Sequence, residues 1–307
     1  MAGGFGYGAR MKILTDFDGV ITDQTEEGLL ERRLFRDEMV RASGQSSADV
    51  DALLARVESE VDAHPSRYGW EHHGRISAYA DEDLFVRVIG LAGCLDGWAD
   101  QGDPAAATVR EGLVREGYER FTRLSDWAYG AMVEHTRAGA IEPLDPRVGA
   151  VFEALLARGD DVVVVSNSST TRVMELLSTL DVKPVAHAED PTARFRVRGD
   201  ARKFALDPEP ESFEANGLSF DVARSAYRTI ITEEKPAAVI GDVFSLDLAL
   251  PLYLTRTDPT TFGGLQVLLR TRDYTPAWAK TLCAEATGEA RLGLLGDFVD
   301  LPAVTGG

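Results

Sequence analysis

The chain has 307 residues, 44% of them hydrophobic, and a formal net charge of -18. This length and composition suit a globular protein with one large core or two domains. The negative charge disfavours nucleic-acid binding, which depends on basic patches, and no apolar run is long enough to span a membrane. Because no signal-peptide pattern is visible and only two cysteines are present, we expect a cytoplasmic protein.

A short apolar run near the start, Ile13 and Leu14, ends in two acidic residues, Asp16 and Asp18, followed by Gly19. Since side chains alternate along a strand, the two carboxylates point to the same side. Close carboxylates are costly unless a cation neutralises them, and their oxygens suit Mg²⁺. The stretch therefore predicts a buried strand that ends at a magnesium site, although Asp and Gly also form ordinary turns.

Residues 24–142 have the apolar spacing of amphipathic helices. One stripe consists of Val50, Leu53, Leu54, Val57 and Val61. We expect this interval to be an all-helical cap without strands, inserted directly after the first strand of the core. A segment of it with weaker periodicity contains His72, His73 and Arg75. Adjacent histidines point apart and make a poor zinc site, so we expect a loop that faces the substrate.

From residue 143 the pattern changes to alternating helices and strands. Pro146 begins a helix that Gly159 ends, and the apolar run 162–165 is typical of a strand buried on both faces. This alternation predicts a doubly wound, mostly parallel α/β sheet, whose ligands lie at the carboxyl ends of the strands. Ser166 and Asn167 follow the strand at that end, where a serine can also cap the next helix.

The interval 191–221 is harder to interpret. The sequence FRVRGDARKFAL alternates as a hairpin does, with Gly199 and Asp200 at its turn. Further on, the apolar run 237–240 ends in Gly241 and Asp242, with Asp247 about one and a half helical turns later. We expect two more strands, near 265–269 and 292–295, to extend the sheet.

The three strand ends together resemble the motifs of the haloacid dehalogenase superfamily of phosphohydrolases. The matching stretches are DFDGV at 16–20, the strand-terminal Ser166, and GDVFSLD at 241–247. The resemblance covers the core, and nothing in the insert at 24–142 matches. It implies that residues 1–23 and 143–307 form the catalytic core, and it implies a phosphatase rather than a dehalogenase, in which the second aspartate is commonly replaced.

The resemblance also implies residue roles. Asp16 would be the nucleophile and Asp18 the acid and base, with Mg²⁺ held by Asp16, Asp18, Asp242 and Asp247. Ser166 and Asn167 would bind the phosphate.

The superfamily also has a basic residue that touches the nucleophile, for which Lys203 is favoured and Arg224 stays open. Lys235 precedes its strand and so lies about 20 Å from Asp242, which excludes it.

The expected function is Mg²⁺-dependent hydrolysis of a small phosphate monoester through an aspartyl phosphate. A phosphomutase would use the same residues, and a dehalogenase or a non-catalytic binding module also remains open. His72, His73 and Arg75 are the candidate specificity residues. The sequence identifies neither the ester nor the oligomeric state.

Overall fold

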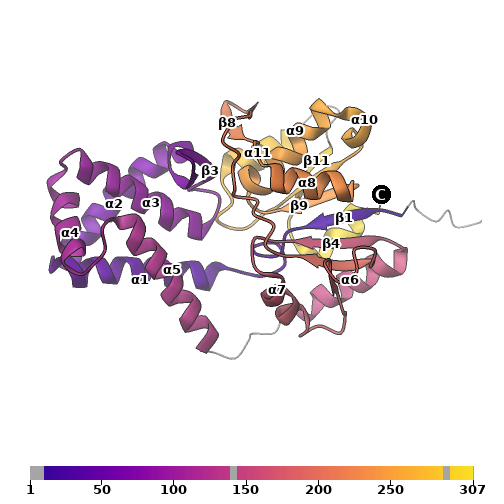
Figure 1. The fold of residues 1–307 in the computed structure, drawn as a ribbon, viewed down its shortest axis with the longest axis horizontal. Helices are drawn as coiled ribbons and strands as arrows, with labels where there is room; N and C mark the ends of the chain where they lie inside the picture. Colours follow the sequence, from indigo (N-terminus) through magenta and orange to yellow (C-terminus); the bar gives the residue numbers. More distant parts are fainter. Residues whose placement is uncertain (1–9, 139–143, 286–290, 307) are drawn as a thin grey trace, which may run out of the picture.

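The computed structural model describes residues 10–138, 144–285 and 291–306 (Figure 1). Within them, seven strands form one sheet in the order β11-β10-β9-β1-β4-β6-β5. Every neighbouring pair is parallel, which confirms the expected α/β core. The strands are β1 (Lys12–Thr15), β4 (Asp161–Val165), β5 (Val185–Ala186), β6 (Phe195–Arg198), β9 (Ala238–Gly241), β10 (Gln266–Arg270) and β11 (Arg291–Leu295).

Helices cover both faces of this sheet, and alternate side chains of each strand enter opposite cores. Ile13 packs with the helices α6 and α7, whereas its neighbour Leu14 packs with α8, α9 and α11. Figure 1 shows these two groups of helices on opposite sides of the sheet. The core helices are α6 (Pro146–Arg158), α7 (Thr170–Leu177), α8 (Ser225–Glu234), α9 (Ala249–Thr257), α10 (Pro259–Phe262), α11 (Ala277–Glu285) and α12 (Leu301–Val304).

The ends of helix α6 follow from its sequence. Asp145 accepts a hydrogen bond from the backbone N–H of Arg147, Pro146 takes the first helical position, and Gly159 ends the helix with φ 101°. Glycine adopts this left-handed conformation without strain, and proline cannot donate a hydrogen bond that the first turn would leave unpaired anyway. Both predicted boundaries are confirmed.

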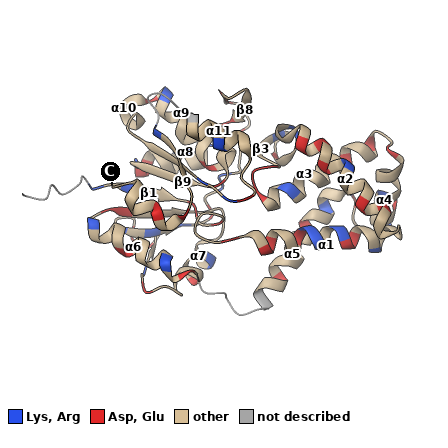
Figure 2. Ribbon diagram, turned by 180° about the vertical axis from the view of Figure 1, so that it is seen from behind, with Lys and Arg blue, Asp and Glu red and all other residues tan. Residues whose placement is uncertain are grey.

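The insert forms a separate bundle that packs at one end of the core (Figure 1). Its apolar stripes meet in a core of their own, which includes the predicted Val50, Leu53, Leu54, Val57 and Val61. Figure 2 shows acidic and basic residues interspersed along α1, as expected of a solvated helix face. The helices are α1 (Thr25–Ser43), α2 (Ser47–Ala63), α3 (Leu84–Asp100), α4 (Pro104–Arg115) and α5 (Phe121–Ala138).

The expectation that residues 24–142 contain no strand is wrong at one place. An antiparallel hairpin consists of β2 (Gly69–His72) and β3 (Arg75–Tyr79). His73 and Gly74 form its two-residue turn with φ 53° and 72°. Positive φ at both positions matches the right-handed twist of hairpin strands, so the turn favours this pairing over a helix.

The predicted hairpin around Gly199 is also wrong. Strand β6 pairs in parallel with β4 and β5, and the chain after it turns back over the sheet end, where the Ala201 N–H donates to the Ser166 carbonyl. The hairpin of this interval lies later, between β7 (Ser212–Ala215) and β8 (Leu218–Asp221). Its turn is Asn216-Gly217, both with positive φ, a common hairpin turn sequence.

Three short helical turns complete the described chain. They are η1 (Pro65–Arg67), the π-helical η2 (Phe244–Leu248) and η3 (Phe298–Asp300). In this part of the chain no helix combines the length and apolar character that a membrane crossing requires. The expected boundary between cap and core, at 142–143, lies outside the described residues.

Candidate active site

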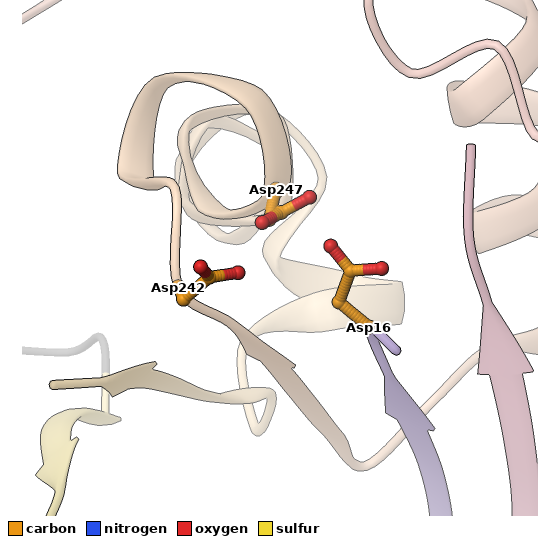
Figure 3. Close-up of side chains that lie close together, drawn as sticks. All are labelled: Asp16, Asp242 and Asp247. Carbon is orange, nitrogen blue, oxygen red and sulfur yellow. The ribbon is translucent and has the colours of Figure 1, made fainter. Parts of the chain in front are cut away.

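Three buried carboxylates converge at the carboxyl end of the sheet (Figure 3). Asp16 follows β1 and Asp242 follows β9, and these two strands are neighbours in the sheet. Asp247 reaches the same point from η2, a π-helical turn of the kind often found at functional sites. One oxygen from each carboxylate lies within 4.8 Å of the others.

Two glycines allow this close approach. A Cβ atom added to Gly19, which has φ 74°, would lie 1.9 Å from Oδ2 of Asp242. A Cβ atom on Gly241 would lie 2.3 Å from Cβ of Asp247. Because real Cβ atoms do not come so near, any larger residue at either position would push the carboxylates apart.

Lys203 joins this cluster. Its Nζ lies 2.7 Å from Oδ2 of Asp16 and 2.6 Å from Oδ1 of Asp247, and its side chain is buried. The Lys203 N–H donates to Oδ1 of Asn167 at 2.7 Å, which ties the loop after β6 to the end of β4. Asn167 thus positions the lysine.

Arg224, the alternative basic residue, has a different place. Its guanidinium is buried and donates to the backbone carbonyls of Ser77, Lys203 and Ser245. It therefore links the cap hairpin, the lysine loop and η2, and does not touch Asp16. Lys235 is exposed and lies before β9, at the opposite end of the strand from Asp242.

The cluster carries more negative than positive charge. Burial and the charge of Asp247 raise the pKa of Asp16 well above its usual range, against the opposing effect of Lys203. Burial raises the pKa of Asp242 as well, and the neighbouring Asp247 and Asp16 raise it further. For Lys203, burial lowers the pKa, but Asp16 and Asp247 outweigh it and the net shift is upward.

A divalent cation fits this donor set. Oδ2 of Asp242 is buried and has no hydrogen-bond partner in the described part of the chain, and one ammonium cannot balance three carboxylates. Hard oxygen donors without a nearby thiol or imidazole among them suit Mg²⁺. The side chain of Asp18 is not part of this triad.

Asp18 lies instead against the end of β4. Its Oδ2 accepts hydrogen bonds from Oγ of Ser166 at 3.0 Å and from Oγ of Ser168 at 2.7 Å. Ser166 was predicted from the sequence, whereas Ser168 was not. The alternation Ser-Asn-Ser after the strand was the available signal, because residues two apart can face the same way.

A cavity of about 550 Å³ lies between these residues and the cap. Its core side includes Asp16, Asp18, Ser166, Asn167, Ser168 and Asp242. Its cap side comes from α1, the hairpin, α3 and α5. The lining residues of the cap are Gln24, Glu27, Glu31, Trp70, Asp83, Phe85, Val86, Ile89, Ser125, Asp126, Tyr129 and Met132.

The three predicted specificity residues are not in this lining. Nδ1 of His72 accepts a hydrogen bond from the Leu206 N–H at 3.2 Å, and Arg75 pairs with Asp221 of the core. His73 is in the hairpin turn. The neighbouring Trp70 does line the cavity and stacks on Phe204, with ring centroids 4.5 Å apart. The hairpin thus approaches the cavity through its tryptophan.

No protein-family model and no curated protein matches the sequence. Several solved structures match with low identity. A 2-haloacid dehalogenase from Pseudomonas syringae pv. Tomato DC3000 is 14% identical, with 97% of this chain and 98% of that chain covered and a TM-score of 0.42.

Two further matches are a haloacid dehalogenase-like family hydrolase from Xanthomonas campestris and a predicted phosphoglycolate phosphatase from Haemophilus somnus 129pt. The first is 13% identical over 97% of this chain and 91% of the other, with a TM-score of 0.45. The second is 16% identical over 96% and 98%, with a TM-score of 0.44. The activity therefore has to follow from the site itself.

Proposed function

We propose that this protein is a Mg²⁺-dependent phosphatase that hydrolyses a small phosphate monoester through an aspartyl phosphate. The observation that carries the proposal is the contact of Lys203 with both Asp16 and Asp247 beside the unpartnered Asp242. This arrangement supplies a carboxylate nucleophile, a fixed positive charge and a set of oxygen ligands at the core end of the cavity. Residues 1–23 and 143–307 would form the catalytic core, and residues 24–142 the cap.

In the first step an oxygen of Asp16 attacks phosphorus and forms an acyl phosphate, while the bond from phosphorus to the leaving oxygen breaks. Asp18, in its protonated form, gives its proton to that leaving oxygen. In the second step Asp18, now a carboxylate, takes a proton from water as the water oxygen attacks phosphorus. The bond from phosphorus to Asp16 then breaks, and inorganic phosphate leaves.

The other residues of the site prepare these steps. The hydrogen bonds from Ser166 and Ser168 hold the Asp18 carboxyl over the site, and either hydroxyl can turn to a phosphoryl oxygen. Lys203 holds Asp16 in place and offers positive charge near the phosphoryl group. Asp16, Asp242 and Asp247 would hold Mg²⁺, which when bound screens the charge between the nucleophile and the phosphate.

A release assay tests the proposal. The protein is incubated with Mg²⁺ and a panel of sugar, nucleotide, amino-acid and aryl phosphates, and inorganic phosphate is measured, with Asp16→Asn as the inactive control. Free phosphate from the parent protein and none from Asp16→Asn supports the proposal. Conversion of a sugar phosphate to its isomer without free phosphate would assign the protein to the phosphomutases. No turnover of any ester would contradict both.

A further inference from the structure

The cavity is acidic at its cap end as well as at its catalytic end. Four carboxylates of the cap line it, namely those of Glu27, Glu31, Asp83 and Asp126. Among the described residues that line the cavity, Arg172 is the one cation, and its Nη2 lies 3.8 Å from Oε1 of Glu27. The remaining carboxylates therefore face the cavity without a basic side chain in its lining to balance them.

Glu31 differs from its neighbours because nothing in the fold explains its burial. The residue is 1% exposed, and its buried Oε2 has no hydrogen-bond partner within residues 10–138, 144–285 and 291–306. Asp83, by contrast, caps α3 by accepting from the N–H groups of Phe85 and Val86 at 2.8 and 2.9 Å. Asp126 pairs with Arg123 at 3.2 Å on the surface. Burying a polar atom without a partner is costly, which points to a partner brought by a ligand.

Aromatic side chains add apolar surface to the cavity that Glu31 lines. Trp70, Phe85, Tyr129 and Phe204 all line the cavity. Phe85 and Tyr129 meet edge to face with centroids 5.9 Å apart. Aromatic faces beside a carboxylate are a common environment for organic ammonium groups, which interact favourably with the aromatic faces and with the negative charge.

We infer that this cavity selects phosphate monoesters whose leaving alcohol carries an amine, with the ammonium group bound by Glu31. This inference rests on the proposed function, since the phosphate end of such an ester would lie at Asp16. An ester with a second anionic group would bring negative charge toward the carboxylates of the cap, and like charges in a partly desolvated cavity repel strongly. A cation would supply the counter-charge that Glu31 needs in its ionised form. Burial and the charge of Asp83 raise the pKa of Glu31 to about 9, so an ammonium ion would also favour its ionised form.

A binding experiment tests this without turnover. Asp16→Asn protein with Mg²⁺ is titrated by calorimetry with 3-aminopropyl phosphate and with 3-hydroxypropyl phosphate, which differ only in the amine. We expect the amino ester to bind at least tenfold more tightly. Adding Glu31→Gln should reduce this ratio to about one, because the amide has the same shape but no charge. Glu26→Gln, the same change at an exposed position of α1, should leave the ratio unchanged.

The outcomes separate this inference from the proposed function. Equal affinities for the two esters, or no binding of the amino ester, overturn the inference even if the parent protein releases phosphate from other esters. A preference that survives Glu31→Gln also overturns it. A preference that depends on Glu31 supports it even if no ester is hydrolysed, in which case the proposed function alone fails. The comparison of esters on the Asp16→Asn protein needs no change at Glu31, so it decides the question if Glu31→Gln does not fold.

Discussion

Replacing Lys203 by Met tests whether its ammonium group organises the site. Met keeps much of the length and apolar volume of the side chain but removes the charge. The substitution leaves Asp16 and Asp247 without the partner that lies 2.7 and 2.6 Å away. Removing one partner of a buried ion pair costs about 3–5 kcal/mol. We expect about 3 kcal/mol at neutral pH, at the lower end, because a carboxyl group of the cluster can take up a proton instead.

The loss of activity should be larger than partial unfolding of the variant would cause. Loss of one positioned donor in a closed site typically lowers kcat by about 100- to 1,000-fold. We expect a decrease of that order in phosphate release from an aryl phosphate with Mg²⁺ present. Urea unfolding, followed by circular dichroism, measures the change in stability and shows whether the variant is folded under assay conditions.

Lys235→Met is the matched control. Lys235 is exposed and lies at the amino end of β9, so the same change should alter stability by less than about 0.5 kcal/mol and leave activity unaltered. Equal losses in the two variants would refute the reasoning from strand direction. Wild-type kcat in a folded Lys203→Met protein would refute the role of the ammonium group.

Further predictions concern the nucleophile, the metal, the buried cap carboxyl and the hairpin. Asp16→Asn should abolish phosphate release while the thermal unfolding midpoint shows a folded protein, because an amide cannot form the acyl phosphate; wild-type turnover would contradict the mechanism. Excess EDTA should abolish activity and added Mg²⁺ restore it, and full activity in EDTA would exclude the metal. Burial raises the pKa of Glu31 to about 9 from an ordinary value of 4.5, so the folded protein keeps a proton that the unfolded chain releases. The contribution of this group to the free energy of unfolding therefore falls as pH rises from about 5 to 9. In urea unfolding, the stability of Glu31→Gln relative to the wild type should rise across that window. A stability difference that stays constant with pH would show that Glu31 does not titrate there. Arg75→Ala should lower the free energy of unfolding by about 1–3 kcal/mol without changing the order of preferred esters, because it removes the pair with Asp221 outside the cavity. A changed order would show that Arg75 contributes to substrate specificity.

The core end of the candidate site could be predicted from sequence because its residues directly follow apolar strands. Asp16, Ser166 and Asp242 each stand one residue after a buried run, and parallel strands bring such positions to the same edge of the sheet. Strand direction also predicted the position of Lys235 at the amino end of β9. Lys203 was harder to choose, because its place depends on tertiary contacts of the loop after β6, such as those with Asn167 and Arg224.

The cap end could not be predicted in the same way. Glu31 lies within a helix that carries many charges, and nothing in its spacing marks it as buried. Its position depends on how α1, α3 and α5 pack together, which is a tertiary property. The hairpin was missed for a different reason, since His73-Gly74 is a weaker turn signal than Asn-Gly and the segment lies between strongly helical stretches.

The two ends of the cavity differ in the charged side chains that they present, and this difference would orient the proposed substrate. At the catalytic end the chain supplies a counter-charge of its own, Lys203, and a carboxylate triad that suits a metal. At the cap end, no basic side chain of the described residues pairs with Glu31, and its Oε2 finds no hydrogen-bond partner among them. A phosphate ester with an ammonium group would meet both conditions at once, with its anion toward the lysine and its cation toward Glu31. A substrate bound in the reverse orientation would place its phosphate beside the carboxylates of the cap, where like charges repel, so the charge pattern favours the orientation that the proposed in-line attack by Asp16 requires.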